Sequence, residues 1–379
     1  MRCLFIPDSF KGTLSAVEVC KTLTEALNEV YPEATSDSIP VADGGEGTLE
    51  CFLSVRKGRR YVQNVAGPLP GQRVSAAYAL LEDQTAVIEM AQAAGLTLVE
   101  GQKDPLGATT YGVGELMDDA LKRGAKEIIL GLGGSATTDL GCGMAAALGV
   151  LFYDEAGKTF VPDGGTLCRV ARIDLSPLES RLRHVKVTAL CDIKNPLLGP
   201  SGAAAVFGPQ KGAGLQEIQC LERGLGSVAA LLERKLKREL CSLPGAGAAG
   251  GLGAGAVAFL NATLSSGIET VLRLNAVEKN LSRYDLVVTG EGCFDAQSLQ
   301  GKVIDGVSSL AKAQGVPVIV IAGGVKDAEL PDLQEKGIVA AFSVNRLPEP
   351  LSQASVKACR NLKATARQVF SLLKAVQKP

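Results

Sequence analysis

Short apolar runs recur near both ends of the chain, and most of them are followed by a turn and then by apolar residues at helical spacing. Short continuous apolar runs bounded by turn residues are typical of buried strands. The predicted strands are 2–6, 36–40, 284–289, 316–321 and 338–343. Because strands that alternate with helices build parallel sheets, we predict a doubly wound α/β sheet. In the flavodoxin-like strand order, 2-1-3-4-5, the loop 8–13 would lie beside the turn after strand 284–289.

Helical spacing is clearest in the first and last helices of this part. Ser15 and Glu18 have the spacing of a capping box, and apolar positions at helical spacing follow them. The last helix is expected over residues 353–375, with Val356 and Cys359 at the start of its apolar stripe. Both helices would bury one face against the sheet.

The middle of the chain shows a different pattern, in which hairpin-like strands are mixed with helices. Strands or other β structure are expected at 60–66, 74–81, 85–90, 127–131, 149–161 and 185–191, and helices at about 110–123 and 215–240. We therefore predict a mixed α/β domain, residues 58–282, inserted into a flavodoxin-like domain formed by residues 1–57 and 283–379.

Composition narrows the class of protein. A length of 379 residues agrees with two domains, because single cores rarely grow that large. Lys and Arg number 39 against 40 Asp and Glu, so no basic surplus points to nucleic acid or to an anionic membrane. No apolar run is long enough for a membrane span, and the N-terminus lacks a secretory pattern. Ten scattered cysteines without CxxC spacing indicate reduced thiols, which predicts a cytoplasmic protein.

The first turn with candidate chemistry is Pro7–Thr13, directly after strand 2–6. Turns at the carboxyl edge of such sheets are where ligands bind. Asp8, Ser9 and Lys11 supply an acid, a hydroxyl and a cation there. A lysine beside a helix N-terminus suits a phosphate or a carboxylate. The alternative is a charged turn before a capped helix.

Two glycine-rich turns follow other strands. Asp43 and Glu46 stand among three glycines, where a ligand could approach the backbone; the alternative is a tight turn with Asp43 as helix cap. The second turn follows strand 127–131 and opens a small-residue helix; its candidate residues are Gly133, Gly134, Ser135 and Thr137. Free N–H groups at a helix start can form an anion cradle, and the alternative is a tightly packed helix start.

Further acids and lysines follow later strands. Asp192 and Asn195 come at the end of strand 185–191 and could hold a divalent cation through oxygen ligands, although a structural turn is equally compatible. A second lysine follows at Lys211. The turn after strand 284–289 adds two more acids and a third lysine; its candidate residues are Gly290, Glu291, Asp295 and Lys302.

Two familiar nucleotide motifs do not fit the chain. The G-x-G-x-x-G at 245–250 follows a helix and a proline rather than a strand, so it does not indicate a dinucleotide site. A glycine-rich loop over a nucleotide, or simple close packing, fits segment 244–255 better. The Gly-Lys-Thr at 157–159 is not a Walker A loop, because Phe152 stands where its first glycine should be.

The three lysines, the paired acids and the glycine turns together indicate phosphoryl transfer. That reaction needs cations and a metal on the phosphates, plus a carboxylate that takes a hydroxyl proton. A covalent nucleophile is not required. The single histidine, His184, lies in a charged segment and argues against a Ser-His-Asp mechanism.

As a set, these motifs resemble the type-1 glycerate kinases of bacteria. The resemblance runs in order over nearly the whole chain and is carried by residues 7–15, 42–48, 133–137, 208–212 and 290–292, with Asp295, Gln297 and Ser298. It implies cytosolic, magnesium-dependent transfer of the γ-phosphoryl group of ATP to D-glycerate, and a two-domain fold with a flavodoxin-like half. It favours O2 as the acceptor, giving 2-phosphoglycerate, and leaves open O3, giving 3-phosphoglycerate.

The roles of single residues are our inference from this chemistry. Lys11 and Ser9 are expected to hold anionic groups together with the Gly133–Thr137 loop. Asp192 or Asp295 is the expected base, and Lys11 is the third catalytic candidate. Magnesium is expected at Glu291 or Asp192. The expected substrate- and phosphate-binding residues are Asp8, Ser9, Asp43, Glu46, Gly133, Gly134, Ser135, Thr137, Asn195, Lys211, Gly290 and Lys302.

Three other readings remain open. The acceptor could be another small hydroxy acid or a polyol. The protein could be a non-catalytic sensor of nucleotides or organic acids, and the intact lysines and acids argue against this. An NAD-dependent dehydrogenase is the least compatible. The expected partners are therefore small molecules; a homo-oligomer is compatible with these residues, which do not determine the oligomeric state.

Overall fold

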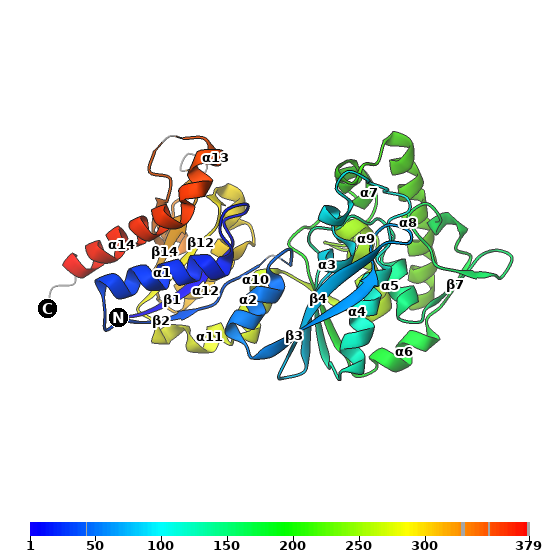
Figure 1. The fold of residues 1–379 in the computed structure, drawn as a ribbon, viewed down its shortest axis with the longest axis horizontal. Helices are drawn as coiled ribbons and strands as arrows, with labels where there is room; N and C mark the ends of the chain where they lie inside the picture. Colours follow the sequence, from blue (N-terminus) through cyan, green and yellow to red (C-terminus); the bar gives the residue numbers. More distant parts are fainter. Residues whose placement is uncertain (43, 327–329, 348, 377–379) are drawn as a thin grey trace. The chain divides into compact units, whose positions relative to one another are not determined.

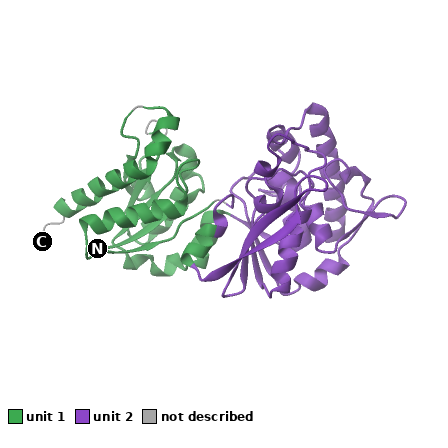
Figure 2. Ribbon diagram, viewed as in Figure 1, with its two compact units in different colours: residues 1–43, 50–55, 266–379 green, residues 44–49, 56–265 purple. Residues whose placement is uncertain are grey.

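The computed structural model describes residues 1–379 except 43, 327–329, 348 and 377–379. Contacts within the chain divide it into two compact units. Unit 1 comprises residues 1–43, 50–55 and 266–379, and unit 2 comprises residues 44–49 and 56–265 (Figure 2). The domain boundaries predicted from the sequence, at 57/58 and 282/283, stay a prediction.

Unit 1 is built around a parallel sheet with the strand order β16-β14-β12-β1-β2. Counted along the chain this is the order 2-1-3-4-5, so the predicted flavodoxin-like arrangement is confirmed. The strands are β1 (Arg2–Pro7), β2 (Thr35–Ser38), β12 (Leu286–Gly290), β14 (Val318–Ala322) and β16 (Ile338–Ser343). Figure 1 labels four of these strands, β14, β12, β1 and β2. The central strands β12 and β14 are buried along their length, as expected where both faces of a parallel sheet are covered.

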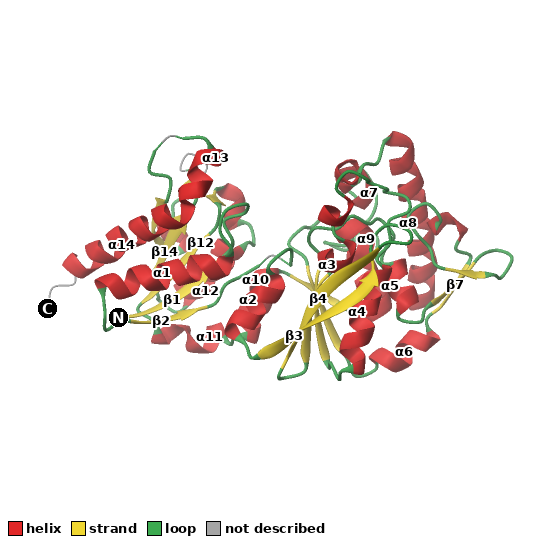
Figure 3. Ribbon diagram, in the orientation of Figure 1, coloured by secondary structure: helices red, strands yellow, loops and turns green. Residues whose placement is uncertain are grey.

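Helices alternate with these strands along the chain (Figure 3). They are α1 (Ala16–Val30), α2 (Thr48–Val55, which begins in unit 2), α10 (Gly267–Leu274), α11 (Val277–Asn280), α12 (Val303–Ala313), α13 (Leu351–Ala354) and α14 (Ala358–Val376), with two short strands, β13 (Cys293–Phe294) and β15 (Gly324–Val325). The longer helices, among them α1, α12 and α14, each bury an apolar stripe. The predicted capping box of α1 is confirmed, since Ser15 Oγ accepts from the Glu18 N–H at 3.2 Å and Glu18 Oε2 accepts from the Ser15 N–H at 2.8 Å.

The last helix begins later than predicted. A 3₁₀ turn, Ser355–Lys357, separates α13 from α14. Val356 lies in this turn and is 87% exposed, and Cys359 is exposed as well, so neither contributes to the buried stripe. The stripe that packs with α1 contains Leu362 and Phe370.

Unit 2 contains a sheet with the order β11-β10-β6-β5-β4-β3. The strands β3 to β5 are antiparallel, whereas β5, β6, β10 and β11 are parallel, so the predicted mixed α/β topology is confirmed. Its strands are β3 (Gly58–Ala66), β4 (Arg73–Leu81), β5 (Thr85–Glu89), β6 (Glu127–Gly131), β10 (Lys186–Leu190) and β11 (Thr263–Ser265), and a small second sheet contains β7 (Leu151–Tyr153), β8 (Thr159–Phe160) and β9 (Arg172–Asp174).

The helices of unit 2 are α3 (Ala91–Ala94), α4 (Tyr111–Lys122), α5 (Cys142–Ala147), α6 (Ser176–Leu182), α7 (Ala203–Phe207), α8 (Leu215–Leu236) and α9 (Ala248–Leu260). The glycine-rich segment 244–255 enters α9, which is buried almost throughout. A Cβ on Gly250 would lie 2.0 Å from the carbonyl oxygen of Thr137. Close packing, one of the two alternatives for this segment, therefore accounts for Gly250, and a loop over a nucleotide stays a prediction. Within the described residues, no helix has both the length and the apolar character of a membrane span.

Candidate functional site

The first group of predicted residues lies at the carboxyl edge of the sheet in unit 1. Pro7 and Gly290 are partners in the register of β1 and β12, and the Asp8 N–H donates to the Gly290 carbonyl at 2.8 Å. The predicted proximity of loop 8–13 and the turn after β12 is therefore confirmed. Gly290 is required there, because a Cβ would lie 1.8 Å from the Ile321 carbonyl oxygen. Asp8 is buried and Lys11 is exposed.

Glu291 occupies the centre of this group. Burial raises the pKa of its carboxyl group above the ordinary value. A hydrogen bond from Ser298 and the charges of Lys302 and Lys11 offset only part of this rise. Its Oε1 is buried and has no hydrogen-bond partner among the described residues. A buried carboxylate oxygen without a partner costs free energy unless a ligand satisfies it. The edge thus combines an acid with available oxygen and two nearby cations.

Asp295 belongs to the same turn but has other contacts. Its Oδ1 accepts from the Gln297 N–H at 3.0 Å and caps the 3₁₀ turn Ala296–Leu299, and its Oδ2 pairs with Lys326 at 3.4 Å. Burial raises the pKa of Asp295, but these hydrogen bonds and the Lys326 charge outweigh it, and the pKa is lowered. Both carboxylate oxygens therefore have partners.

In unit 2, two glycine turns touch each other through their backbones. The Gly133 N–H donates to the Gly44 carbonyl at 3.0 Å. A Cβ on Gly131 would lie 2.4 Å from the Gly44 oxygen, and one on Gly133 would lie 2.5 Å from the Gly45 Cα. The turn that carries Glu46 is therefore packed on the Gly133–Thr137 loop. Asp43, predicted in the same turn, lies outside the described residues.

Glu89 supports this turn and was missed by the sequence analysis. It ends β5 opposite Gly131 and is 2% exposed. Its Oε1 accepts from the Leu49 N–H at 2.8 Å, and its Oε2 accepts from Gln92 Nε2 at 3.1 Å. Burial raises the pKa of Glu89, and nearby Glu46 adds to this. An acid directly after the apolar run 86–88 was the available signal.

The side chains of the glycine loop point inward rather than to solvent. Ser135 and Thr137 are buried, and their hydroxyl oxygens lie 3.2 Å apart. Lys211, predicted to bind substrate, is 3% exposed; its Nζ donates to the Thr137 carbonyl at 2.6 Å and to Ser135 Oγ at 3.3 Å. Gly134, in contrast, is exposed, and α5 begins only at Cys142. The sequence predicted that this loop opens a small-residue helix. In the structure, residues 138–141 separate the Gly133–Thr137 loop from the start of α5.

Asp139 anchors the far end of the loop and was also missed. It is fully buried, and its Oδ2 accepts from the N–H and the Oγ1 of Thr110 at 2.8 and 2.7 Å. The N–H groups of Gly141 and Gly143 donate to the same carboxylate at 3.0 and 3.2 Å. Burial raises the pKa of Asp139 above its ordinary value, and these hydrogen bonds offset only part of that rise.

Asp192 and Asn195 follow β10 at the edge where the glycine turns meet. A Cβ on Gly44 would lie 2.7 Å from the Cβ of Leu190, the last residue of β10. Asp192 is exposed, and the Asn195 amide donates to the Ser201 carbonyl at 2.8 Å. Among the residues that the structure describes, no three His, Cys, Asp or Glu side chains form a metal cluster. Magnesium usually needs only one or two carboxylates beside substrate phosphates. A site with a single protein carboxylate, Glu291 or Asp192, is therefore compatible with the lack of such a cluster among the described residues.

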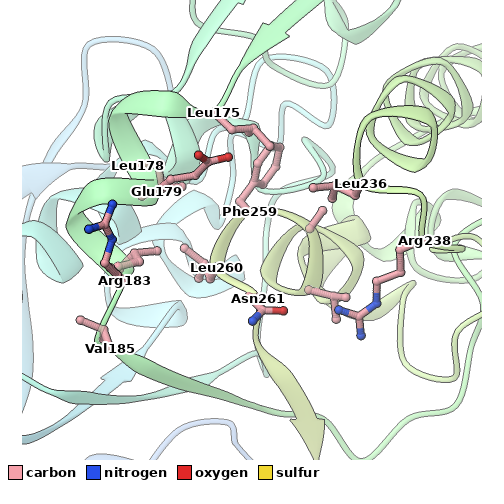
Figure 4. Close-up of a pocket in the computed structure, with 13 residues that line it drawn as sticks. Leu175, Leu178, Glu179, Arg183, Val185, Leu236, Arg238, Phe259, Leu260 and Asn261 are labelled. Carbon is pink, nitrogen blue, oxygen red and sulfur yellow. The ribbon is translucent and has the colours of Figure 1, made fainter.

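A separate pocket lies elsewhere in unit 2, between α6, the end of α8 and the end of α9 (Figure 4). Its volume is about 410 Å³, and its apolar floor includes Leu178 and Phe259. Arg183 and Arg238 lie at its sides. It includes none of the predicted site residues.

Comparisons with known proteins match the chain from end to end. The family model described as the glycerate kinase family matches residues 3–374. "Glycerate kinase" of Halalkalibacterium halodurans is 45% identical over 96% of both chains, and "Glycerate 2-kinase" of Escherichia coli is 42% identical over 98% of both. The crystal structure described as glycerate kinase 2 from Salmonella typhimurium LT2 is 44% identical, with a TM-score of 0.89 over 100% of this chain and 99% of that one.

Proposed function

Since this chain belongs to the glycerate kinase family, we propose that it transfers the γ-phosphoryl group of ATP to D-glycerate, at O2. The name of the relative from Escherichia coli, glycerate 2-kinase, supports O2 as the acceptor. The substrates are then small molecules. A cytoplasmic location agrees with the reduced-thiol composition, and the oligomeric state stays undetermined.

The observation that carries the proposal is the group at the edge of β1 and β12. Glu291 has a buried oxygen without a partner among the described residues, and Lys11 and Lys302 are close enough to lower its pKa. An acid with available oxygen and two cations suits a metal-bound polyphosphate better than a neutral ligand. The nearby Ser9 adds a hydroxyl to this edge.

Magnesium fits this group. A hard cation prefers carboxylate oxygen, and the unpartnered Oε1 of Glu291 offers one. We assign Glu291 as the protein ligand that would hold magnesium, with Asp192 as the other candidate. When bound, the metal would neutralise charge on the phosphates during transfer. Lys11 and Lys302 would then bind phosphate oxygens directly.

We assign the base to Asp192 rather than to Asp295. A general base must accept a proton from the glycerate hydroxyl. Asp295 has a structural role instead, since it caps the 3₁₀ turn Ala296–Leu299 and pairs with Lys326. The lowered pKa of Asp295 also makes it a weaker base. Asp192 is exposed directly after β10, at the carboxyl edge of the sheet, where ligands bind in such folds.

An assay with purified enolase tests the proposal and the position of transfer. The protein is incubated with ATP, magnesium and D-glycerate, and enolase is added without phosphoglycerate mutase. We expect immediate phosphoenolpyruvate, because enolase uses 2-phosphoglycerate. Consumption of ATP with phosphoenolpyruvate only after mutase is added would mean transfer to O3. Without any consumption of ATP the proposal fails, and binding of ATP or glycerate would then indicate a sensor.

A further inference from the structure

The glycine loop of unit 2 is held by a lysine that approaches it from inside the protein. Lys211 ends a 3₁₀ turn, Pro209–Lys211, and its amino group reaches the Thr137 carbonyl and Ser135 Oγ. The Thr137 N–H in turn donates to Ser135 Oγ at 3.2 Å. Lys211 is 3% exposed, so its contacts are made within the protein.

The opposite face of the loop has a different character. Gly134 is exposed and Gly133 is half-buried, whereas the side chains of residues 135 and 137 to 139 are buried. The N–H groups of Gly133, Ala136 and Thr137 donate within the protein, so an anion that reaches this loop from solvent would meet the backbone at exposed Gly134 and not the amino group of Lys211. Asp139 holds the loop at its other end through four hydrogen bonds.

We propose that Lys211 is a positioning residue of the proposed kinase reaction, which fixes the Gly133–Thr137 loop in the shape that binds an anionic group of a substrate and does not itself touch that group. The expected change in KM rests on the proposed function, whereas the expected change in hydrogen exchange does not. Burial lowers the pKa of Lys211 to about 7, and the charge of Asp139 raises it part of the way. The amino group donates hydrogen bonds to the loop in either protonation state.

Lys211→Met tests the proposal, because methionine fills a similar volume without a donor. The Thr137 carbonyl and Ser135 Oγ would lose their partner, and we expect amide hydrogen exchange of residues 133–141 in the ligand-free protein to become at least about tenfold faster. We also expect KM to rise about tenfold for one substrate, the one that the loop binds, with kcat changed less than about threefold.

Lys103→Met is the matched control. Lys103 is an exposed neighbour, and its Nζ donates to the Gln210 carbonyl at 2.9 Å, outside the loop. Exchange and kinetics of this variant should equal those of the wild type. If Lys211→Met does not fold, Ser135→Ala removes one acceptor of the same lysine, and the same changes should appear at smaller size.

The outcomes separate the two proposals. A raised KM with unchanged exchange of residues 133–141 would mean that Lys211 touches the substrate, and the positioning role would be wrong. Unchanged KM and exchange would also overturn it, as would faster exchange without a change in KM, which indicates a structural role only. If the wild type shows no phosphoryl transfer but the exchange still rises in Lys211→Met, the proposed function fails and the loop contact stands alone.

Discussion

The carboxylate of Glu89 accepts a hydrogen bond from the backbone N–H of Leu49 at 2.8 Å, 40 residues earlier in the chain. Glu89 is buried at the end of β5, and Leu49 lies in the first turn of α2. An acid near a helix N-terminus satisfies N–H groups that have no partner within the helix. This contact ties the glycine turn that carries Glu46 to the central sheet of unit 2.

Glu89→Gln should change the pH dependence of stability. Burial raises the pKa of Glu89 in the folded protein above its ordinary value of 4.5. The uncharged form is therefore favoured on folding, and the contribution of Glu89 to stability falls as pH rises above that value. The free energy of unfolding of Glu89→Gln should rise relative to the wild type as pH increases from about 4.5, until the folded-state pKa is passed, measured by urea denaturation at a series of pH values. Glu82→Gln, at an exposed position, is the control variant. The prediction is contradicted if the stability difference between Glu89→Gln and the wild type shrinks as pH rises, or if it equals the difference measured for Glu82→Gln.

Lys11→Ala should abolish turnover with an unchanged melting profile. Lys11 is exposed on the loop after β1, and its charge acts on Glu291 at the proposed phosphate site. The loss removes a cation needed in phosphoryl transfer without opening a cavity in the core. Steady-state kinetics and thermal melting check both parts. Exposed Lys21 on α1 gives the control variant, Lys21→Ala; near-normal activity of Lys11→Ala would refute the assigned role.

Asp192→Asn should lower kcat at least about 100-fold, the scale of a lost general base. The amide keeps the shape of the side chain and cannot take up a proton from the acceptor hydroxyl. Single-turnover measurements with saturating ATP and glycerate separate this loss from weaker binding. An increase of KM alone would assign Asp192 to binding.

Asp295→Asn is the matched comparison for the base. Asparagine keeps the cap at Gln297 and loses the ion pair with Lys326, so we expect a loss of less than about 1 kcal/mol in stability and a smaller fall in kcat than for Asp192→Asn. Calorimetry and the same kinetic assay check it. If Asp295→Asn showed the larger fall in kcat, the two assignments would have to be exchanged.

Glu291→Gln should raise the magnesium concentration needed for half-maximal rate by about tenfold or more, because a carboxylate ligand becomes a weaker amide ligand. The KM for glycerate should change little. Activity is measured over a magnesium titration at saturating ATP, with Glu335→Gln on the exposed turn 334–336 as control. The same magnesium dependence in Glu291→Gln and the wild type would exclude the metal role.

Local sequence signals predicted much of unit 1. The apolar runs predicted the strands, Ser15 and Glu18 predicted the start of α1, and alternation with helices predicted a parallel sheet, for which the flavodoxin-like order was the hypothesis that the structure confirms. From that order follows the contact between Asp8 and Gly290, 282 positions apart in sequence. These features depend on periodicity and on general rules of connection, which one sequence contains.

Other parts of the candidate site could not be predicted in this way. Whether Lys211 points to solvent or into the protein depends on the packing of segments that are distant in sequence. A lysine in a glycine-rich turn is compatible with either orientation. The groups that donate hydrogen bonds to the carboxylates of Glu89 and Asp139 include backbone N–H groups and a hydroxyl, which the fold brings near. For segment 244–255 the sequence left a loop over a nucleotide and close packing open, because the packing of Gly250 and Gly255 on Thr137 and Leu140 depends on residues more than 100 positions away.

The glycines of α9 have a consequence for how the protein fails under heat. Residues 249–251 have left-handed backbone angles, and Gly253 and Gly255 lower the helix propensity of the turns that follow, so the segment persists only while its surroundings hold it. Those surroundings include Thr137 and Leu140, whose backbone atoms lie against Gly250 and Gly255. We therefore expect the Gly133–Thr137 loop and α9 to unfold locally as one unit. Heat inactivation of the proposed enzyme should share one rate with unfolding of unit 2, with no inactive state in which α9 is intact and the loop is lost.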